Sequence, residues 1–303
     1  MDRREITAIL ASAGLRPQHQ FGQNFMVDQS TLRAIADAGG VGPDDVVLEV
    51  GPGVGNLTRQ LSERANNGVV LAVDIDRKLM PAAQRHHAAL KNVHWLLTDV
   101  LAGKHEIEPE VLAKLRALRA EYPMGSLRLV SNLPYNAASP IVANLLVLMW
   151  QEWKAAVQQP LLFSRMAFTV QWEVAERLRA ESGTKDYGPL GILVQLLSEV
   201  RVKKKIPPGS FWPPPKIHSA LVTLDPQIPP RDTIQDVVAL QRLLTGVFSH
   251  RRQKLQNGLK HYLGDSYSPD LPERLAAVGI DVTLRPEALS PKQFVVLANC
   301  VGI

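Results

Sequence analysis

Short apolar runs alternate with helical patterns over the first two thirds of the chain. The clearest runs are residues 46–50, 69–73, 94–97 and the run that includes Leu129. Strands that alternate with helices favour a parallel sheet with crossover helices. Ligands of such sheets bind at the carboxyl ends of the strands. We therefore expect an α/β, Rossmann-like fold whose functional groups lie along one edge of the sheet.

The remaining pattern predicts further elements and two domains. Helices are expected over residues 1–15, 30–39 (with Ser30 as N-cap), the stretch that follows Thr58 up to about residue 64, 78–89, 104–121 and 140–153, and strands near 161–169, 192–202 and 217–224. The charged helix 104–121 is expected to be a surface excursion. A proline-rich linker at 226–231 precedes helical patterns at 235–248, 251–263, 270–278 and 290–299. The sequence thus predicts a sheet domain over 1–226 and a small helical domain over 227–303.

Positive charge is concentrated in the last third of the chain. The whole chain has a net charge of +5, whereas residues 201–303 hold 14 Lys and Arg against 8 Asp and Glu, a net charge of +6. A basic surface of this kind indicates a polyanionic partner such as RNA, although a merely solubilising surface is the simpler alternative. The clustered cations are Lys203, Lys204 and Lys205, and Arg251, Arg252 and Lys254.

Other features narrow the setting in which the protein is expected to act. The apolar stretch 141–150 is too short to cross a bilayer and contains Asn144, and residues 1–5 lack the apolar core of a signal peptide. Cys300 is the one cysteine, which excludes an internal disulfide and a cysteine-based metal cluster. We expect a cytoplasmic protein with no membrane partner and no metal.

Acidic and glycine residues follow three of the expected strands. Gly51, Gly53 and Gly55 form a turn in which a ligand can approach the backbone, and no Gly-Lys-Ser/Thr follows them, which argues against a P-loop nucleotide site. Asp74 ends the next strand and could accept hydrogen bonds from ribose hydroxyls, a feature that fits NAD and S-adenosylmethionine equally. Asp99 could accept from an adenine amino group. Helix or turn capping is the alternative for both aspartates.

The run Asn132-Leu133-Pro134-Tyr135 distinguishes the two cofactors. The amide oxygen of Asn132 and the carbonyls near Pro134 offer acceptors for the two hydrogens of an exocyclic amino group, and Tyr135 offers a ring on which a base can stack. A methyltransferase that acts on a base amino group needs such a site, whereas a hydride-transfer enzyme has no evident use for it. A plain Asn-initiated turn is the alternative.

Eight stretches of the chain, in this order and spacing, resemble one known family. They are residues 23–26, 51–58, 74–76, 98–101, 132–136, 171–178, 208–219 and 248–252. The sequence is similar to the ribosomal small-subunit RNA adenine dimethyltransferases, whose bacterial members are the kasugamycin-sensitivity enzymes, from about residue 16 to 299. The resemblance implies methyl transfer from S-adenosylmethionine to adenine amino groups, in two adjacent adenines near the 3′ end of small-subunit ribosomal RNA, during ribosome biogenesis.

The resemblance also implies a role for each matching residue. Asn24 and the backbone of Met26 would touch the methionine end of S-adenosylmethionine, with Gly51 and Gly53 beneath it and the N-terminal segment as a cover. Asp74 would hold the ribose, and Asp99 the adenine of the cofactor. Asn132 and the carbonyls near Pro134 would take the target amino group. Tyr135 and Phe211 would sandwich the target base, whereas the alternative for Phe211 is a hydrophobic plug in a proline-rich loop.

The chain departs from the family pattern at a few positions, and three other readings stay open. Met26, Asp74, Trp172 and Gln253 stand where Leu, Glu, Lys and Lys are usual, and residues 102–127 look longer than in many relatives. The rival functions are an NAD-dependent oxidoreductase, a non-catalytic RNA-binding assembly factor, and a methylase of large-subunit RNA. The protein is expected to act as a monomer on the immature small subunit.

Overall fold

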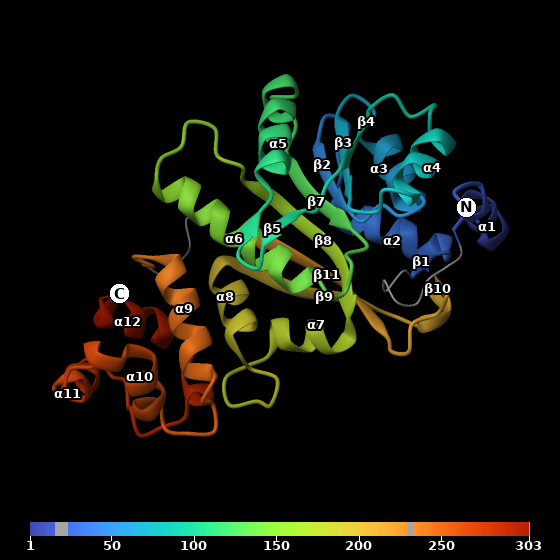
Figure 1. Ribbon diagram of the computed structural model, residues 1–303. Coiled ribbons are helices and arrows are strands. Elements are labelled where there is room, and N and C mark those ends of the chain that lie inside the picture. Colours follow the sequence, from blue (N-terminus) through green and yellow to red (C-terminus); the bar gives the residue numbers. More distant parts are fainter. Residues whose placement is uncertain (16–23, 229–232, 303) are drawn as a thin grey trace.

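A seven-stranded, mixed sheet forms the centre of the computed structural model, which describes residues 1–15, 24–228 and 233–302 (Figure 1). The strands are β2 (Val46–Val50), β3 (Val69–Asp74), β4 (Val93–Leu97), β7 (Leu127–Ser131), β8 (Phe163–Gln171), β9 (Ser198–Ile206) and β11 (Ser219–Pro226). Their order is β4-β3-β2-β7-β8-β11-β9, and only β11 runs against the others. The expected α/β, Rossmann-like fold is confirmed.

Helices cover both faces of the sheet because the central parallel strands are apolar on both sides. Val47, Val70 and Val130 pack on one face against α2 (Gln29–Gly39) and α3 (Asn56–Arg64). Leu48 and Leu129 face the opposite way. On that side lie α5 (Pro109–Glu121), α6 (Ala138–Lys154), α7 (Trp172–Arg179) and α8 (Pro189–Leu197).

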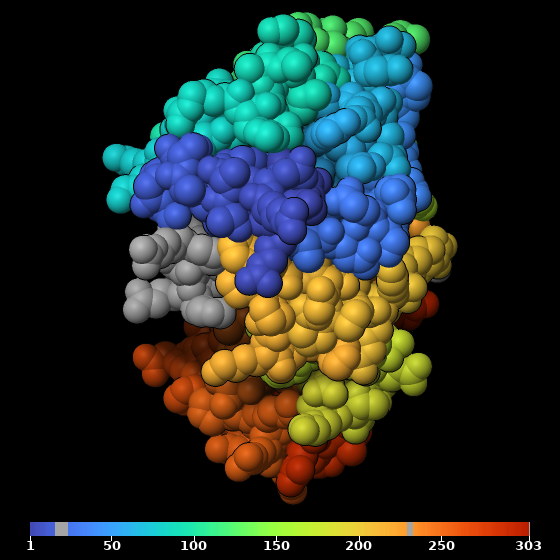
Figure 2. Space-filling view, turned by 90° about the vertical axis from the view of Figure 1, so that its right-hand side faces the viewer, coloured from blue at the N-terminus to red at the C-terminus, as the bar shows by residue number. Residues whose placement is uncertain are grey.

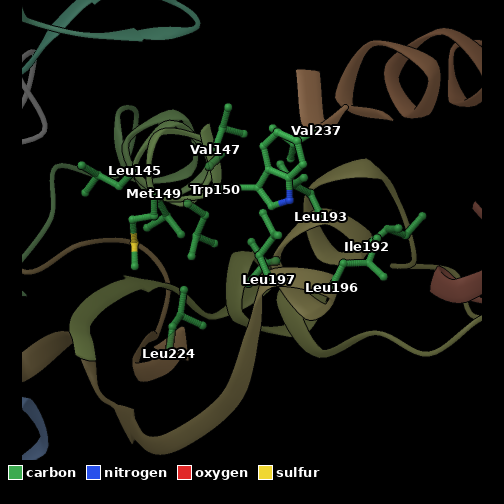
Figure 3. Close-up of a cluster of buried hydrophobic side chains, with 14 of the residues drawn as sticks. Leu145, Val147, Met149, Trp150, Ile192, Leu193, Leu196, Leu197, Leu224 and Val237 are labelled. Atoms are coloured by element: carbon green, nitrogen blue, oxygen red, sulfur yellow. The ribbon is translucent and has the colours of Figure 1, made fainter. Parts of the chain in front are cut away.

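The C-terminal helices extend this second layer. They are α9 (Val237–Phe248), α10 (Leu255–Leu263), α11 (Leu271–Ala277) and α12 (Pro291–Val301). Trp150 of α6, Leu193 of α8 and Val237 of α9 belong to one buried cluster, and Figure 3 shows their side chains pointing toward one another. The helical region is therefore packed onto the sheet region through a shared apolar core. The predicted linker at 226–231 falls partly outside the described residues.

Small elements complete the fold. The helices α1 (Arg3–Ser12) and α4 (Leu79–His86) pack together, and β1 (Phe25–Met26) pairs with β10 (Phe211–Trp212). A hairpin is formed by β5 (Leu101–Gly103) and β6 (Glu106–Ile107), and short 3₁₀ turns lie at Pro208–Ser210, Gly264–Ser266 and Pro286–Ala288. Within the described residues, no helix combines the length and apolarity needed to cross a bilayer.

Three expectations about elements are wrong. Residues 189–197 form a helix rather than the start of a strand; α8 is buried on most sides and so shows no clear periodicity. The predicted helix 104–121 begins only at Pro109, after the hairpin, and it buries Val111, Leu115 and Leu118 rather than projecting from the surface. The N-cap of α2 is Asp28, whose side chain accepts from the Ser30 N–H, and not Ser30.

Candidate active site

The carboxyl ends of β2, β3 and β7 bring most of the predicted site residues to one edge of the sheet. The Gly53 N–H donates to Oδ2 of Asp74 at 3.3 Å. A Cβ on Gly51 would lie 3.1 Å from the Cγ of Pro134, so only a glycine leaves this approach open. Gly51, Gly53, Asp74 and the Asn132–Tyr135 turn are therefore neighbours, as the strand pattern predicts.

The conformation of the glycine turn requires glycine, and a buried histidine stabilises it. Gly51, Gly53 and Gly55 have φ of 71°, 58° and 85°, values that favour glycine. Nε2 of His87 donates to the carbonyl of Val54 at 3.0 Å, and a Cβ on Gly55 would lie 2.5 Å from the His87 ring. Burial lowers the pKa of His87, which keeps the ring neutral in this role.

The N-terminal segment covers this turn. A Cβ on Gly53 would lie 3.2 Å from the ring of Phe25, so Phe25 rests directly on the glycine turn. Nδ2 of Asn56, at the start of α3, donates to the carbonyl of Met26 at 2.8 Å. In Figure 2 the dark blue N-terminal residues lie between the cyan segment of α4 and β4 and the golden segment of β9 and β10. Met26 and Asn24 thus lie beside the glycine turn and Asn132, and their contact with the methionine end of a cofactor stays a prediction.

Glu49, just before the turn, is a buried carboxyl group with unused bonding capacity. Its Oε2 has no hydrogen bond of good geometry within the part of the chain that the structure describes, although the Thr58 hydroxyl lies close enough to oppose the effect of burial on its pKa. Burial raises the pKa of Glu49 to about 8, and the Asp74 carboxylate adds to the shift. A buried acceptor of this kind fits a ligand that brings a cationic donor to the glycine turn.

Asp74 and Asp99 differ in their surroundings. Asp74 accepts from the N–H groups of Gly53 and Asp76, and burial raises its pKa. The next residue, Ile75, is 65% exposed and offers an apolar surface beside it. Asp99 is exposed, and its Oδ1 accepts from the Leu101 N–H at 2.9 Å in the turn that leads to β5. Asp99 thus has the capping contact that the sequence left open as an alternative.

The Asn132 side chain is fixed by two other segments. Its Oδ1 accepts from the hydroxyl of Thr169 on β8 at 2.5 Å, and its Nδ2 donates to the carbonyl of Asn24 at 3.4 Å. The second contact joins the turn after β7 to the N-terminal cover. Of the carbonyls near Pro134 that were expected to be acceptors, that of Pro134 itself is not free, because it accepts from the N–H groups of Ala137 and Ala138 at the start of α6.

The two predicted aromatic residues are placed differently. Tyr135 is half-buried, its phenol oxygen lies 2.6 Å from the hydroxyl of Ser219, and burial raises its pKa. Phe211 is only 3% exposed and packs with Met26 and Leu221 in the apolar cluster below β1. The Phe211 ring therefore forms part of the wall behind Met26 and presents little open surface in this structure.

The basic residues belong to two separate surfaces. Lys203, Lys204 and Lys205 are exposed on the edge strand β9, where Lys205 lies 4.7 Å from the centroid of the Trp172 ring. Arg252 and Lys254 are exposed in the turn between α9 and α10. Arg251 instead donates to Glu287 and to the Lys185 carbonyl, so its main contacts are within the protein.

Several residues that shape the site were not singled out from the sequence. Ser219 and Asn56 lie inside stretches that carry the family resemblance. The sequence therefore marked the stretches as important, but it did not indicate the hydrogen-bond partners of these two residues. His87 contacts the glycine turn from 33 residues away. Thr169 is a fully buried hydroxyl residue within the stretch 166–170 of β8, which is otherwise apolar. A polar residue at such a position is a signal that could have been used, because buried hydroxyls need partners.

Comparisons with known proteins agree on one family. The family model described as ribosomal RNA adenine dimethylase matches residues 14–294. A protein of Magnetococcus marinus named ribosomal RNA small subunit methyltransferase A is 38% identical over 294 residues, covering 97% of this chain and 95% of that protein. The protein of the same name from Geobacillus thermodenitrificans is 34% identical, covering 97% and 94%.

Solved structures support the same fold. A dimethyladenosine transferase from Plasmodium falciparum superposes with a TM-score of 0.68 at 23% identity, covering 92% of this chain and 98% of that one. The 23S rRNA methyltransferase ErmE superposes with a TM-score of 0.59 at 23% identity, covering 92% and 100%. Sequence identity this low shows the fold alone.

Proposed function

The chain belongs to the ribosomal RNA adenine dimethylase family, and from this premise we propose the reaction that it catalyses. It transfers methyl groups from S-adenosylmethionine to the exocyclic amino groups of adenines in small-subunit ribosomal RNA. Two adjacent adenines near the 3′ end are the proposed targets, each dimethylated during ribosome biogenesis. Relatives at 34–38% identity carry the small-subunit name, which favours this substrate over large-subunit RNA.

One observation carries the proposal above the others. Asn132 lies in the same corner of the sheet as the glycine turn, with its amide held by Thr169 and by the Asn24 carbonyl. An oriented amide oxygen beside a cofactor-type turn suits a base amino group and has no role in hydride transfer. The NAD-dependent reading is therefore set aside.

The residues around the turn fit S-adenosylmethionine. That group supplies an electrophilic methyl carbon on a sulfonium and carries a cationic ammonium. Glu49, with its unpartnered buried oxygen, would face the ammonium end, where Asn24, the Met26 backbone, Gly51 and Gly53 form the walls. Asp74 would accept from the ribose hydroxyls. Asp99 and the exposed Ile75 would border the adenine.

Asn132 would accept one hydrogen of the target amino group. Because the Pro134 carbonyl already accepts from α6, the carbonyl of Leu133 is the better candidate for the other hydrogen. The nitrogen lone pair of an adenine amino group is delocalised into the ring, and two acceptors in the right directions favour a pyramidal, more nucleophilic nitrogen. Aligning the two reactants in this way contributes about 7–11 kcal/mol toward lowering the barrier.

The base must leave its stack before it can enter the corner. Flipping costs about a few kcal/mol, and stacking on an aromatic ring returns about 1–3 kcal/mol per base. Tyr135 would supply that ring, and Phe211 would form the second wall if the β1–β10 segment moves to expose it. Pro134 would hold the turn between Asn132 and Tyr135 in shape.

The proposed RNA surface includes both basic regions. Lys203, Lys204 and Lys205 on β9, and Arg252 and Lys254 before α10, would contact phosphates, and Arg251 would support the second region from below. The sheet region 1–226 would perform the chemistry, and 227–303 would position the RNA. We propose that one copy of the chain suffices and that it acts in the cytoplasm, where the immature subunit is available.

Methyl transfer to immature small-subunit particles tests the proposal. The purified protein is incubated with such particles and isotopically labelled S-adenosylmethionine, and the RNA is digested and analysed by mass spectrometry. We expect labelled N6,N6-dimethyladenosine. Large-subunit particles are the matched control, and labelling there but not in the small subunit would overturn the substrate assignment. If the protein is correctly folded but transfers no methyl groups to either particle, the alternative of a non-catalytic assembly factor would be favoured.

A further inference from the structure

A cavity of about 450 Å³ opens beside the first turn of α6, between the sheet region and the C-terminal helices. We call it the flanking cavity. Its floor and sides come from α6, α8 and α9, and its rim comes from the turn of the β5–β6 hairpin. The residues that matter below are Lys104, His105, Asn136, Leu190, Leu193 and Gln241.

The flanking cavity begins one residue after the proposed base-binding ring. Asn136, which lines it, directly follows Tyr135, and the Pro134 carbonyl fixes the start of α6 through Ala137 and Ala138. The phenol of Tyr135 points to Ser219 on β11, whereas Asn136 points to the cavity lined by α8 and α9. The proposed base-binding ring and the flanking cavity are thus one residue apart in the same turn.

The walls of the flanking cavity have the chemistry of a nucleobase site. Leu190 and Leu193 of α8 provide an apolar wall, and the amides of Asn136 and Gln241 can donate to and accept from a base edge. Lys104 and His105 are exposed at the rim, where a phosphate would lie. A fully ionic ligand would make no favourable contact with the two leucines, and an apolar ligand would leave the two amides without hydrogen-bond partners. A base has both an apolar face and polar edges.

Covalent continuity of RNA supplies the occupant. A nucleotide whose base stacks on Tyr135 is joined to each neighbour by one phosphodiester link, so a neighbouring base must lie close to the same turn. We propose that the flanking cavity holds the base of a nucleotide next to the target adenine, with its phosphate at Lys104. This inference rests on the proposed function and adds that α9 helps to select which adenine enters the active site.

The test combines a cavity-filling substitution with an altered RNA. Leu190 is partly buried, and Leu190→Trp would fill much of the cavity; Val278→Trp, at a position 48% exposed outside the cavity, is the matched control. Small-subunit particles are reconstituted with RNA that lacks the base of the nucleotide on the 5′ or the 3′ side of the target. Methyl transfer is measured for each protein on each particle, together with the melting temperature and cofactor affinity.

On one of the two altered particles, the wild type should lose about tenfold in kcat/KM. On intact particles, Leu190→Trp should have a kcat/KM about tenfold below that of the wild type. Removing that base should lower the kcat/KM of Leu190→Trp by less than a further twofold. Three results would overturn the inference. Leu190→Trp could methylate intact particles at the wild-type rate, or the losses from Leu190→Trp and from the missing base could multiply when combined. The wild type could also methylate both altered particles as fast as intact ones. If Leu190→Trp fails to fold, Asn136→Ala replaces it with the same criteria. A wild type inactive on intact particles would instead refute the proposed function.

Discussion

The phenol oxygen of Tyr135 lies 2.6 Å from the hydroxyl oxygen of Ser219. This contact joins the turn after β7 to the first residue of β11, which ends the proline-rich segment that carries Phe211. Two stretches that lie 84 residues apart in the chain therefore form one wall of the candidate site. Because the hydrogen bond is at the edge of the ring, it fixes the tilt of the ring without covering its face.

Substitutions of Tyr135 should separate stacking from ring orientation. Tyr135→Ala removes the ring and should raise KM for the small-subunit particle by about ten- to a hundredfold, in line with 1–3 kcal/mol per stacked base. Tyr135→Phe keeps the ring and loses one hydrogen bond, so KM for the small-subunit particle should rise only about threefold to tenfold. Steady-state kinetics at a fixed cofactor concentration measure both. Equal losses for the two variants would show that stacking is not the function of this ring.

Thr169 should act as a positioning residue for Asn132. Thr169→Val removes the hydroxyl that holds Oδ1 and frees the amide to rotate, so kcat should fall by about tenfold while KM for the cofactor changes little. Thr169→Ser keeps the hydroxyl and should restore most of kcat. The melting temperatures of both variants serve as the control. A Ser variant as slow as the Val variant would contradict this role.

Binding of S-adenosylmethionine should release a proton from Glu49. With a pKa of about 8, this carboxyl is mostly protonated at pH 7, and an ammonium group beside it would favour ionisation. Affinity for the cofactor should therefore increase between pH 6 and 8. Titration calorimetry at pH 7 in two buffers of different ionisation enthalpy measures the released proton. Glu49→Gln should release none, and wild-type binding without proton release would disprove the assigned contact.

The same carboxyl should make the ligand-free protein less stable as the pH rises. The pKa of Glu49 is about 8 in the folded chain, whereas an unperturbed glutamate, as in the unfolded chain, has a pKa of 4.5. As the pH rises, the unfolded chain therefore loses this proton first. The free energy of unfolding should thus decline between pH 4.5 and 8 through this group, and burial of Asp74 acts in the same direction. Denaturant titrations across this range should give a shallower decline for Glu49→Gln. An identical slope in both proteins would argue against a buried, protonated Glu49.

Neighbouring arginines should have separable effects. Arg251→Ala loses the contacts with Glu287 and the Lys185 carbonyl and should lower the melting temperature by about 2–4 °C for each kcal/mol lost. Arg252→Ala should leave stability unchanged and weaken RNA binding, with the salt dependence of log Kd reduced by about 0.7–0.9. Filter binding at several salt concentrations and thermal melts measure the two effects. Reversed effects would show that Arg251 is the RNA contact.

Local patterns were sufficient to predict the central parallel strands, but not the start of β9, the antiparallel direction of β11 or everything packed against the sheet. The strands 46–50 and 69–73 are short, apolar and bounded by polar turns, so their type and parallel arrangement follow from the sequence. Residues 189–197 are equally apolar, so their sequence pattern fits a helix as well as a strand. They form a helix that packs between the sheet and α9, and this long-range packing is not visible in the local sequence. The hairpin at 101–107 is too short to leave a periodic signal.

The candidate site shows the same division. Gly51, Asp74 and Asn132 follow strands directly, and the order of strands in a parallel sheet brings them together. The contact that refines Asn132 comes from a distant segment, because Thr169 lies 37 residues further along the chain. The contact that occupies the Pro134 carbonyl is local, since it comes from the N–H groups of Ala137 and Ala138. No local pattern reports the long-range bond between Thr169 and Asn132. The occupied Pro134 carbonyl follows instead from the start of α6 at Ala138, two residues before the predicted start at 140.

The Asn132→Ala variant tests the central claim most directly. Methyl transfer to adenines of immature small-subunit particles and affinity for S-adenosylmethionine are measured side by side for the variant and the wild type. Loss of one oriented transition-state contact should reduce kcat by about a hundred- to a thousandfold while the cofactor still binds within a few-fold of its normal affinity. Near-normal transfer by Asn132→Ala would contradict an active site built around this amide.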